Sequence, residues 1–411
     1  MPDPRLVARG MPAMDPAYRT ARSIPVNPQE YPIRKVALLF EPKGVQQRML
    51  SGIGQYAAER PHWRWKALAP HDSAVEPLRK WRPDGIIGMI ETPKLAAAVV
   101  RMRSAVVDLA HWYRRPPGAR VTVDNAQVGR MAAAYFLERK FRHFGYVGLA
   151  EACFVQERLQ AFAGALREAG FSCASLLIRK KPARSPAWSE PDPEVGQWLN
   201  GLPRPAAIFA CNDQVGLTVV ATCVERKISV PEAVAVLGAD NHELLCTLAH
   251  PALSSIRLPM RRMGWMAASL LESLLNGQRP PDQPLVLPSP GIVTRASTAG
   301  VMVADPLVRK ALDLIRVNAG RRMQVPDIVS AVLVSRRNLE YRFRKEMGRG
   351  IHEEIQLARV ELAKKLLAET DFKLIGVARR AGFASGSRLS TAFQRYTGLK
   401  PSVYRREMKM G

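Results

Sequence analysis

Between residues 33 and 297 the sequence alternates short apolar runs with stretches long enough for amphipathic helices. Eight runs are apolar over consecutive residues: VALLF (36–40), DGIIGMI (84–90), SAVVDLA (104–110), ARVTVD (119–124), HFGYVGLA (143–150), CASLLI (173–178), PAAIFACND (205–213) and AVAVLGADN (233–241). Strands that are apolar on both faces occur in parallel sheets, where helical crossovers cover both sides. The alternation therefore predicts a doubly wound α/β architecture, long enough for two lobes.

The remainder of the chain has a different character. Residues 1–32 contain seven prolines without periodicity, and beyond residue 305 the pattern is helical throughout. We therefore predict a disordered arm over 1–32, an α/β domain over 33–297, a linker over 298–305 and an all-α domain over 306–411.

Two stretches in the all-α domain repeat one another with an offset of 50 residues. SRRNLEYRFRKEMG (335–348) and SGSRLSTAFQRYTG (385–398) coincide at Ser, Leu, Phe and Gly. In each, Leu and Phe share one helical stripe, Ser can cap the helix start and Gly can end it. A shorter helical segment precedes each copy, and Gly382 can supply a tight turn in the second copy, whereas the first has no glycine there. This pattern predicts two helix-turn-helix motifs.

The outer face of each repeated helix is basic and suited to DNA. Arginine can pair bidentately with guanine, and Ser, Thr and Asn can reach other base edges, although any one of these arginines is as consistent with a phosphate contact. The predicted DNA-binding residues are Arg336, Arg337, Asn338, Tyr341 and Arg344 in the first copy and Ser387, Arg388, Thr391 and Arg395 in the second. The alternative is an ordinary helical bundle with a solvated basic surface.

A helix predicted over residues 351–369 joins the two copies. It would be about 27 Å long at 1.5 Å per residue, while major-groove faces recur about every 34 Å along DNA. One chain could thus place two reading helices on successive turns of double-stranded DNA.

The charge of the chain agrees with a polyanionic partner. The formal net charge is +25, and residues 306–411 carry 23 Lys and Arg against 10 Asp and Glu, about half of the excess. The five cysteines are scattered and lack metal-ligand spacing, which predicts reduced thiols, no metal site and no cofactor. Without an apolar run of membrane-spanning length or a signal peptide, we expect a cytoplasmic protein with no membrane partner.

Polar side chains follow several of the predicted strands. Asp124, Asp213 and Asp240 stand at strand ends, and Arg158 lies near the start of the helix after HFGYVGLA. In two-lobed α/β domains these edges meet at a ligand cleft. Carboxylates and a guanidinium suit vicinal hydroxyls, so the sequence predicts a neutral polyol, most simply a sugar, as effector. For Asp124 and Asp213, helix capping is an equal alternative.

The all-α domain resembles the DNA-binding domain of the AraC family of bacterial transcription factors. The second copy carries the resemblance, with VARRAGF followed at the expected spacings by S, L, F, G and KPSVYRRE. Because AraC-type modules often recruit RNA polymerase, the resemblance implies transcriptional activation.

The α/β domain resembles the LacI-family sensor and its periplasmic sugar-binding relatives. VTVDNAQVGRMAAAYFLERKFRHFGYVG, ERLQAFAGAL and AIFACNDQVGLTVV follow its pattern in order. The resemblance implies a periplasmic-binding-like fold, a homodimer, and effector contacts from Arg158, Asp213 and Asp240, with Asp124 matching less reliably. Joined to an AraC-type module, it resembles the bacterial xylose-operon regulators, which implies a pentose such as xylose as effector.

Two other function classes remain as alternatives. GIGQYA (52–57) matches the G-x-G-x-x-A dinucleotide fingerprint formally, but it comes twelve residues after the first strand, too late for the strand-to-helix turn of that site. We expect these glycines inside a helix, and a sugar-binding or dinucleotide-binding enzyme is the weaker reading. The second alternative is a nonspecific DNA-binding protein that draws its affinity from charge alone.

Overall fold

The computed structural model describes residues 32–60, 62–179, 190–299, 303 and 305–410. The chain divides into two compact units near residue 300, an α/β unit and a helical unit, and each is described by itself. The predicted arm over 1–32 lies outside the described residues except for Pro32, and so do residues 300–302 and 304 of the predicted linker.

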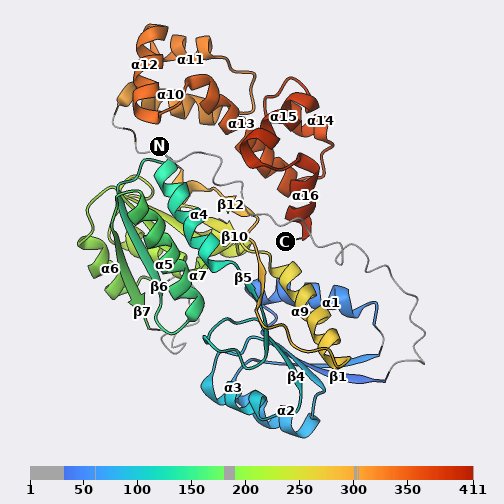
Figure 1. The fold of residues 1–411 in the computed structure, drawn as a ribbon. Coiled ribbons are helices and arrows are strands. Elements are labelled where there is room, and N and C mark those ends of the chain that lie inside the picture. Colours follow the sequence, from blue (N-terminus) through green and yellow to red (C-terminus); the bar gives the residue numbers. More distant parts are fainter. Residues whose placement is uncertain (1–31, 61, 180–189, 300–302, 304, 411) are drawn as a thin grey trace. The chain divides into compact units, whose positions relative to one another are not determined.

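The first lobe of the α/β unit is built on a six-stranded sheet of order β11-β5-β4-β3-β1-β2, whose paired strands are all parallel. Its strands are β1 (Arg34–Leu39), β2 (Trp63–Leu68), β3 (Gly85–Gly88), β4 (Ala105–Asp108), β5 (Ala119–Val123) and β11 (Leu285–Leu287). Its helices are α1 (Gly44–Ala57), η3 (Asp72–Ala74), α2 (Val75–Trp81), α3 (Pro93–Val100) and α9 (Met260–Leu275). Figure 1 shows α1 and α9 side by side on one face of this sheet and α2 and α3 on the other.

The second lobe has a six-stranded sheet of order β12-β10-β9-β8-β6-β7, parallel except for the antiparallel pair β10 and β12. Its strands are β6 (His143–Leu149), β7 (Cys173–Ile178), β8 (Ala206–Ala210), β9 (Val234–Asp240), β10 (Ser254–Arg257) and β12 (Gly291–Val293). Its helices are α4 (Asn125–Glu138), α5 (Cys153–Glu168), α6 (Pro193–Asn200), α7 (Asp213–Glu225), α8 (Glu243–Leu248) and η4 (Ala296–Thr298). The predicted two-lobed, doubly wound fold is confirmed.

The chain crosses between the lobes three times, after β5, after β10 and after β11. Hydrogen bonds tie the crossings together. The Asp124 amide donates to the Leu287 carbonyl over 2.8 Å. The Ser289 amide donates to the Gln127 side chain, and its hydroxyl donates to the Arg257 carbonyl, both over 2.8 Å. The three crossings therefore form one bonded hinge.

The GIGQYA stretch lies inside α1, as expected from its distance to the first strand. A Cβ atom on Gly52 would fall 1.8 Å from the Arg261 carbonyl oxygen of α9, and one on Gly264 of α9 would fall 1.9 Å from the Met49 carbonyl oxygen. The two helices thus approach backbone to backbone. Gly52 and Gly264 therefore serve the packing of α1 on α9. The GIGQYA stretch forms no phosphate-binding turn, because it lies inside a helix.

The helical unit contains two small cores joined by one helix. Its helices are α10 (Pro306–Val317), α11 (Val325–Val332), α12 (Arg336–Met347), α13 (Ile351–Glu369), α14 (Leu374–Arg380), α15 (Gly386–Thr397) and α16 (Pro401–Met410). The α13 helix contributes Ile351 and Ile355 to the core around α10–α12, and Val360, Ala363 and Leu367 to the core around α14–α16. Figure 1 shows α13 running between the two groups. The predicted all-α domain with a connecting helix over 351–369 is confirmed.

No helix in the described part of the chain is both long and apolar enough to span a membrane.

Candidate DNA-reading helices and effector cleft

The first repeated helix, α12, has the predicted ends and buried stripe. The Ser335 hydroxyl accepts the Asn338 amide over 3.3 Å at its start, and Gly348 ends it with a φ of 71°. Leu339 and Phe343 are fully buried. These contacts fix the rotation of α12 about its axis, and so decide which side chains face outward.

All five residues predicted to bind DNA on α12 are exposed: Arg336, Arg337, Asn338, Tyr341 and Arg344. Two of them already have partners on the same helix. Arg336 pairs with Glu340 at 2.8 Å, and the Asn338 side-chain oxygen accepts the Arg342 Nε over 2.7 Å. Arg342 also donates to the carboxylate of Asp305, the residue that caps α10. This face is therefore partly organised without DNA.

The second repeated helix, α15, is built in the same way. The Ser385 hydroxyl accepts the Arg388 amide over 3.3 Å, and Gly398 ends the helix with a φ of 74°. Leu389 and Phe393 are fully buried. Its four predicted DNA-binding residues are all exposed: Ser387, Arg388, Thr391 and Arg395.

Both turns use a left-handed residue, but only one of them is glycine. Gly382 has a φ of 76° before α15. In the first copy Leu333 takes this role with a φ of 63°, and its side chain is 83% exposed. Left-handed geometry costs a residue with a Cβ about 1–2 kcal/mol. The two left-handed residues are not at equivalent positions, since Leu333 stands two residues before the capping Ser335 and Gly382 three residues before the capping Ser385.

Arg359 of α13 braces the two halves of the helical unit. It is 8% exposed, and its Nη2 donates to the Met323 carbonyl over 2.8 Å and to the Arg321 carbonyl over 3.3 Å. A Cβ atom on Gly382 would lie 2.6 Å from the Ala319 carbonyl oxygen and 3.0 Å from the Arg359 Nε. The loop after α10 thus packs directly on the turn before α15, which fixes the two reading helices relative to one another.

In the α/β unit, Asp213 is buried at the first position of α7, three residues after β8 ends. Asn212, not Asp213, caps α7. The Asp213 carboxylate instead accepts the His242 amide over 2.6 Å and the Ser255 hydroxyl, and Cys246 Sγ lies 3.3 Å away. Burial, with the nearby charge of Asp240, raises the pKa of Asp213 to about 7.

Asp240 ends β9 and meets a residue from the other lobe. Its backbone carbonyl accepts Nη2 of Arg48, a residue of α1, over 2.5 Å. Burial raises the pKa of Asp240 to about 6, although the charges of Arg158 and Arg48 act against this rise. Burial also lowers the pKa of Arg48 despite the attraction of Asp240 and Asp213. Charged groups from both lobes therefore meet at the carboxyl ends of the strands.

Arg158 is 4% exposed on the second turn of α5. Its Nη1 donates to the Cys211 carbonyl, and its Nε donates to the Asn125 side chain over 3.0 Å. Asn125 in turn donates to Glu157 over 3.2 Å. The charge of Arg158 acts on Asp240, and its side chain is held by Asn125 of α4 and by Cys211, the residue after β8.

The fourth predicted effector residue, Asp124, has a different position. It lies in the hinge, and its carboxylate caps α4 by accepting the Gln127 amide over 2.7 Å. The capping alternative therefore describes this residue, whereas it does not describe Asp213.

Several residues of the cleft were not predicted. Arg48 enters from α1, and His111 of the first lobe contacts Glu157 of α5 at 3.0 Å and the Thr122 hydroxyl at 2.7 Å. Although burial opposes it, the contact with His111 brings the pKa of Glu157 below its usual value. Asn125 had a sequence signal, since it follows Asp124 directly at the end of the VTV strand. Arg48 and His111 stand at no strand end that the pattern could identify.

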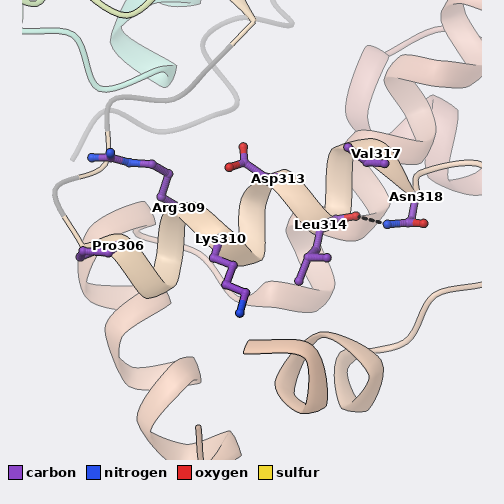
Figure 2. Close-up of a pocket in the computed structure, with 7 residues that line it drawn as sticks. All are labelled: Pro306, Arg309, Lys310, Asp313, Leu314, Val317 and Asn318. Carbon is purple, nitrogen blue, oxygen red and sulfur yellow. Dashed lines mark hydrogen bonds between the residues drawn. The ribbon is translucent and has the colours of Figure 1, made fainter. Parts of the chain in front are cut away.

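The helical unit has a hollow of about 380 Å³, and Figure 2 shows the residues that line it. Its seven lining residues all belong to α10 or its C-terminal cap: Pro306, Arg309, Lys310, Asp313, Leu314, Val317 and Asn318. It contains none of the predicted effector residues. Among the described residues no group of three His, Cys, Asp or Glu side chains could hold a metal ion.

Comparisons with known proteins agree with this division into two parts. Residues 133–298 match a family model for a periplasmic binding protein-like domain, and residues 328–407 match one for a helix-turn-helix domain. The C-terminal part is also 36% identical over 108 residues to a putative AraC-like transcription regulator of Streptomyces lividans, covering 26% of this chain and 36% of that protein.

Two matches extend over nearly the whole chain. The xylose operon regulatory protein of Escherichia coli K12 is 27% identical over 380 residues, covering 90% of this chain and 96% of the relative. The solved structure of a xylose-binding transcription activator superposes with a TM-score of 0.57 at 26% identity, covering 91% of this chain and 98% of that one. These relatives are regulators of transcription, which sets aside the enzyme alternative. The chain is a transcription regulator in which an AraC-type helix-turn-helix domain follows a periplasmic binding protein-like domain.

Proposed function

We propose that this protein senses a pentose, D-xylose in the first place, and responds by changing its binding to an operator in double-stranded DNA. The contact of Arg48 with Asp240 carries the proposal, because it brings a guanidinium from one lobe to the buried carboxylates of the other. Carboxylate oxygens accept from sugar hydroxyls, and guanidinium groups donate to them. The relatives named for xylose support this choice of sugar.

The effector contacts are proposed for Arg158, Asp213 and Asp240, with Arg48 and Asn125 added. A sugar that bonds to groups of both lobes favours their closed arrangement over the open one. The bonded hinge at Asp124 lets the lobes rotate as bodies about the three crossings. Asp124 is proposed to act in this hinge.

The proposed DNA contacts are made by the exposed faces of α12 and α15, one half-site for each helix. We propose that the protein acts in the bacterial cytoplasm as a homodimer, so that two chains read tandem half-sites. Activation through RNA polymerase follows from the AraC type of the module.

Three variants test the two sites separately. We expect Arg388→Ala and Arg337→Ala to weaken binding to the operator by about 1–3 kcal/mol each when they read bases, and to leave sugar affinity unchanged. Asp240→Ala is expected to abolish sugar binding and to leave sugar-free DNA binding intact. Lys365→Ala, which removes one exposed charge from α13, is the matched control for net charge.

Sugar binding is measured by thermal shift with D-xylose, D-ribose, L-arabinose, D-glucose and xylitol. A sugar at 100 times its Kd adds about 2.7 kcal/mol of stability. A selective shift with D-xylose that Asp240→Ala abolishes supports the proposal, and no shift with any pentose refutes it. DNA affinity that depends on salt and charge alone, with Arg388→Ala equal to Lys365→Ala, would favour nonspecific binding.

A further inference from the structure

Arg295 is one of the residues that fix the last segment of the α/β unit before the linker, together with the buried Ser297 and Thr298. Arg295 Nη1 donates to the Leu253 carbonyl over 2.9 Å, and its Nη2 donates to the Asn241 side-chain oxygen over 2.9 Å. The Arg295 amide also donates to the Ser254 hydroxyl over 2.7 Å. The η4 helix follows directly, and the chain then continues through the linker to α10. Arg295 is thus an anchor close to the exit from the sensor.

A chain of hydrogen bonds joins this anchor to the effector cleft. The Ser255 hydroxyl donates to the Asp213 carboxylate, and the Asn241 amide donates to the same hydroxyl over 2.9 Å. Asn241 then accepts Arg295 through its side chain. Three hydrogen bonds therefore connect Asp213, a residue proposed to bind the sugar, with Arg295 of the exit segment.

The backbone between these bonds is strained. Asp240 has a φ of 115° and Asn241 a φ of 48°, both in the region that residues with a Cβ rarely adopt. Such conformations persist only where the surroundings hold them, and here Arg48, Ser255 and Arg295 do so. A change in the contacts of Asp240 therefore alters the backbone of Asn241 and its hydrogen bond to Arg295.

We propose that Arg295 is a positioning residue that couples the occupied effector cleft to the linker and the DNA-binding domain. The inference rests on the proposed function, since it needs a sugar at Asp213 and Asp240. Sugar binding shifts the 240–241 turn, the turn moves the Arg295 anchor, and the exit segment passes the displacement along the chain. Arg295 itself lies outside the proposed sugar contacts, so its loss separates binding from response.

The test measures operator affinity of the full chain with and without saturating D-xylose, and the ratio of the two is the coupling ratio. Arg295→Lys keeps the charge and the aliphatic stem but replaces the fork that reaches two acceptors. We expect its Kd for D-xylose to stay within about threefold of wild type, while its coupling ratio falls to within about twofold of 1. A role in stability alone would leave the coupling ratio unchanged.

Two further variants sharpen this test. Asn241→Ala removes the acceptor from the other end of the same bond, so the double variant should lose no more coupling than either single variant. Tyr135→Phe is the matched control, because its hydroxyl bonds Thr294 and Thr298 of the same exit segment without touching the chain from Asp213. It should keep the wild-type coupling ratio.

The outcomes are distinguishable. A wild-type coupling ratio of 1 refutes the proposed function and the inference together. A wild-type response that Arg295→Lys and Asn241→Ala both retain refutes the inference and leaves the proposed function standing. Loss of coupling in Tyr135→Phe as well would also overturn the inference. It would mean that coupling needs only a well-fixed exit segment and does not depend on the bonds from Asp213 to Arg295.

Discussion

Replacing Gly382 by alanine probes the contact that fixes the two reading helices. Gly382 has a φ of 76°, and its added Cβ would lie 2.6 Å from the Ala319 carbonyl oxygen and 2.8 Å from that of Arg321. Gly398 has a φ of 74°, and a Cβ there meets nothing within 4 Å. The two substitutions therefore share the backbone strain and differ in the close approach.

The magnitudes follow from this difference. Left-handed geometry costs alanine about 1–2 kcal/mol, and the smaller entropy of its unfolded chain returns about 0.4–1 kcal/mol. Gly398→Ala should thus cost about 1 kcal/mol. In Gly382→Ala the loop at 319–321 must also shift, which weakens the bonds of Arg359 to Arg321 and Met323. Bonds from a charged donor contribute about 1.5–3 kcal/mol each, so we expect a total loss of about 3–5 kcal/mol.

Urea unfolding of the full chain measures both losses. Circular dichroism at about 222 nm follows the helices of both units, while tryptophan fluorescence follows the α/β unit alone, because all seven tryptophans lie between Trp63 and Trp265. The substitutions should move the circular dichroism transition of the helical unit and leave the fluorescence transition in place. Equal losses for Gly382→Ala and Gly398→Ala would refute the argument that the turn braces the two halves.

Two further predictions concern the α/β unit. Burial raises the pKa values of Asp213 and Asp240 to about 7 and about 6, so the folded state holds protons that the unfolded chain releases near pH 4. Their contribution to stability is complete below that pH and is lost as the pH rises through the folded pKa values. The Tm of the sugar-free protein should therefore fall between about pH 5 and 7.5, and fall less in Asp213→Asn; equal slopes would contradict this cause. On α1, Gly52→Ala should cost about 3 kcal/mol or more, since its Cβ would fall 1.8 Å from the Arg261 carbonyl oxygen. Gly54→Ala, exposed with no atom within 4 Å, should stabilise by about 0.5–1 kcal/mol in the same urea titration, and a similar effect of both would refute the packing role of Gly52.

The eight strands predicted from the sequence are all present, and seven of them are largely buried. The eighth, the edge strand β7, is partly exposed along its length and was marked by the apolar run CASLLI. The four that were not predicted are β2, β10, β11 and β12, which are short or lie at sheet edges. In β2, residues 64–67 are exposed, so the run WRWKAL has no continuous apolar signal. An edge strand forms because its backbone pairs with the neighbouring strand, and this pairing leaves no apolar pattern in the sequence.

The candidate effector residues that follow a strand could be predicted from the sequence. Those that come from a helix of the other lobe could not. Asp213 and Asp240 stand at strand ends, and parallel strands bring such ends together. Arg48 reaches Asp240 across 192 residues of sequence, from the second turn of α1, whose buried face packs on α9. Only the closure of one lobe on the other makes that arginine part of the site. Leu333 is a further case, because the sequence offered no glycine for the turn before α12 and a leucine takes the left-handed conformation there.

The proposed coupling reaches the first reading helix by a shorter route than the second. The anchor Arg295 and the cap Asp305 are separated by ten positions of chain. Asp305 accepts Arg342 of α12 over 2.7 Å, and Arg342 donates to Asn338 on the face proposed to read DNA over 2.7 Å. A displacement of Asp305 would therefore act on α12 directly through Arg342, whereas it would reach α15 only through α13 and Arg359. The sugar should accordingly change base preference at the half-site read by α12 more than at the half-site read by α15, and the duplicated motif becomes a pair of unequal readers.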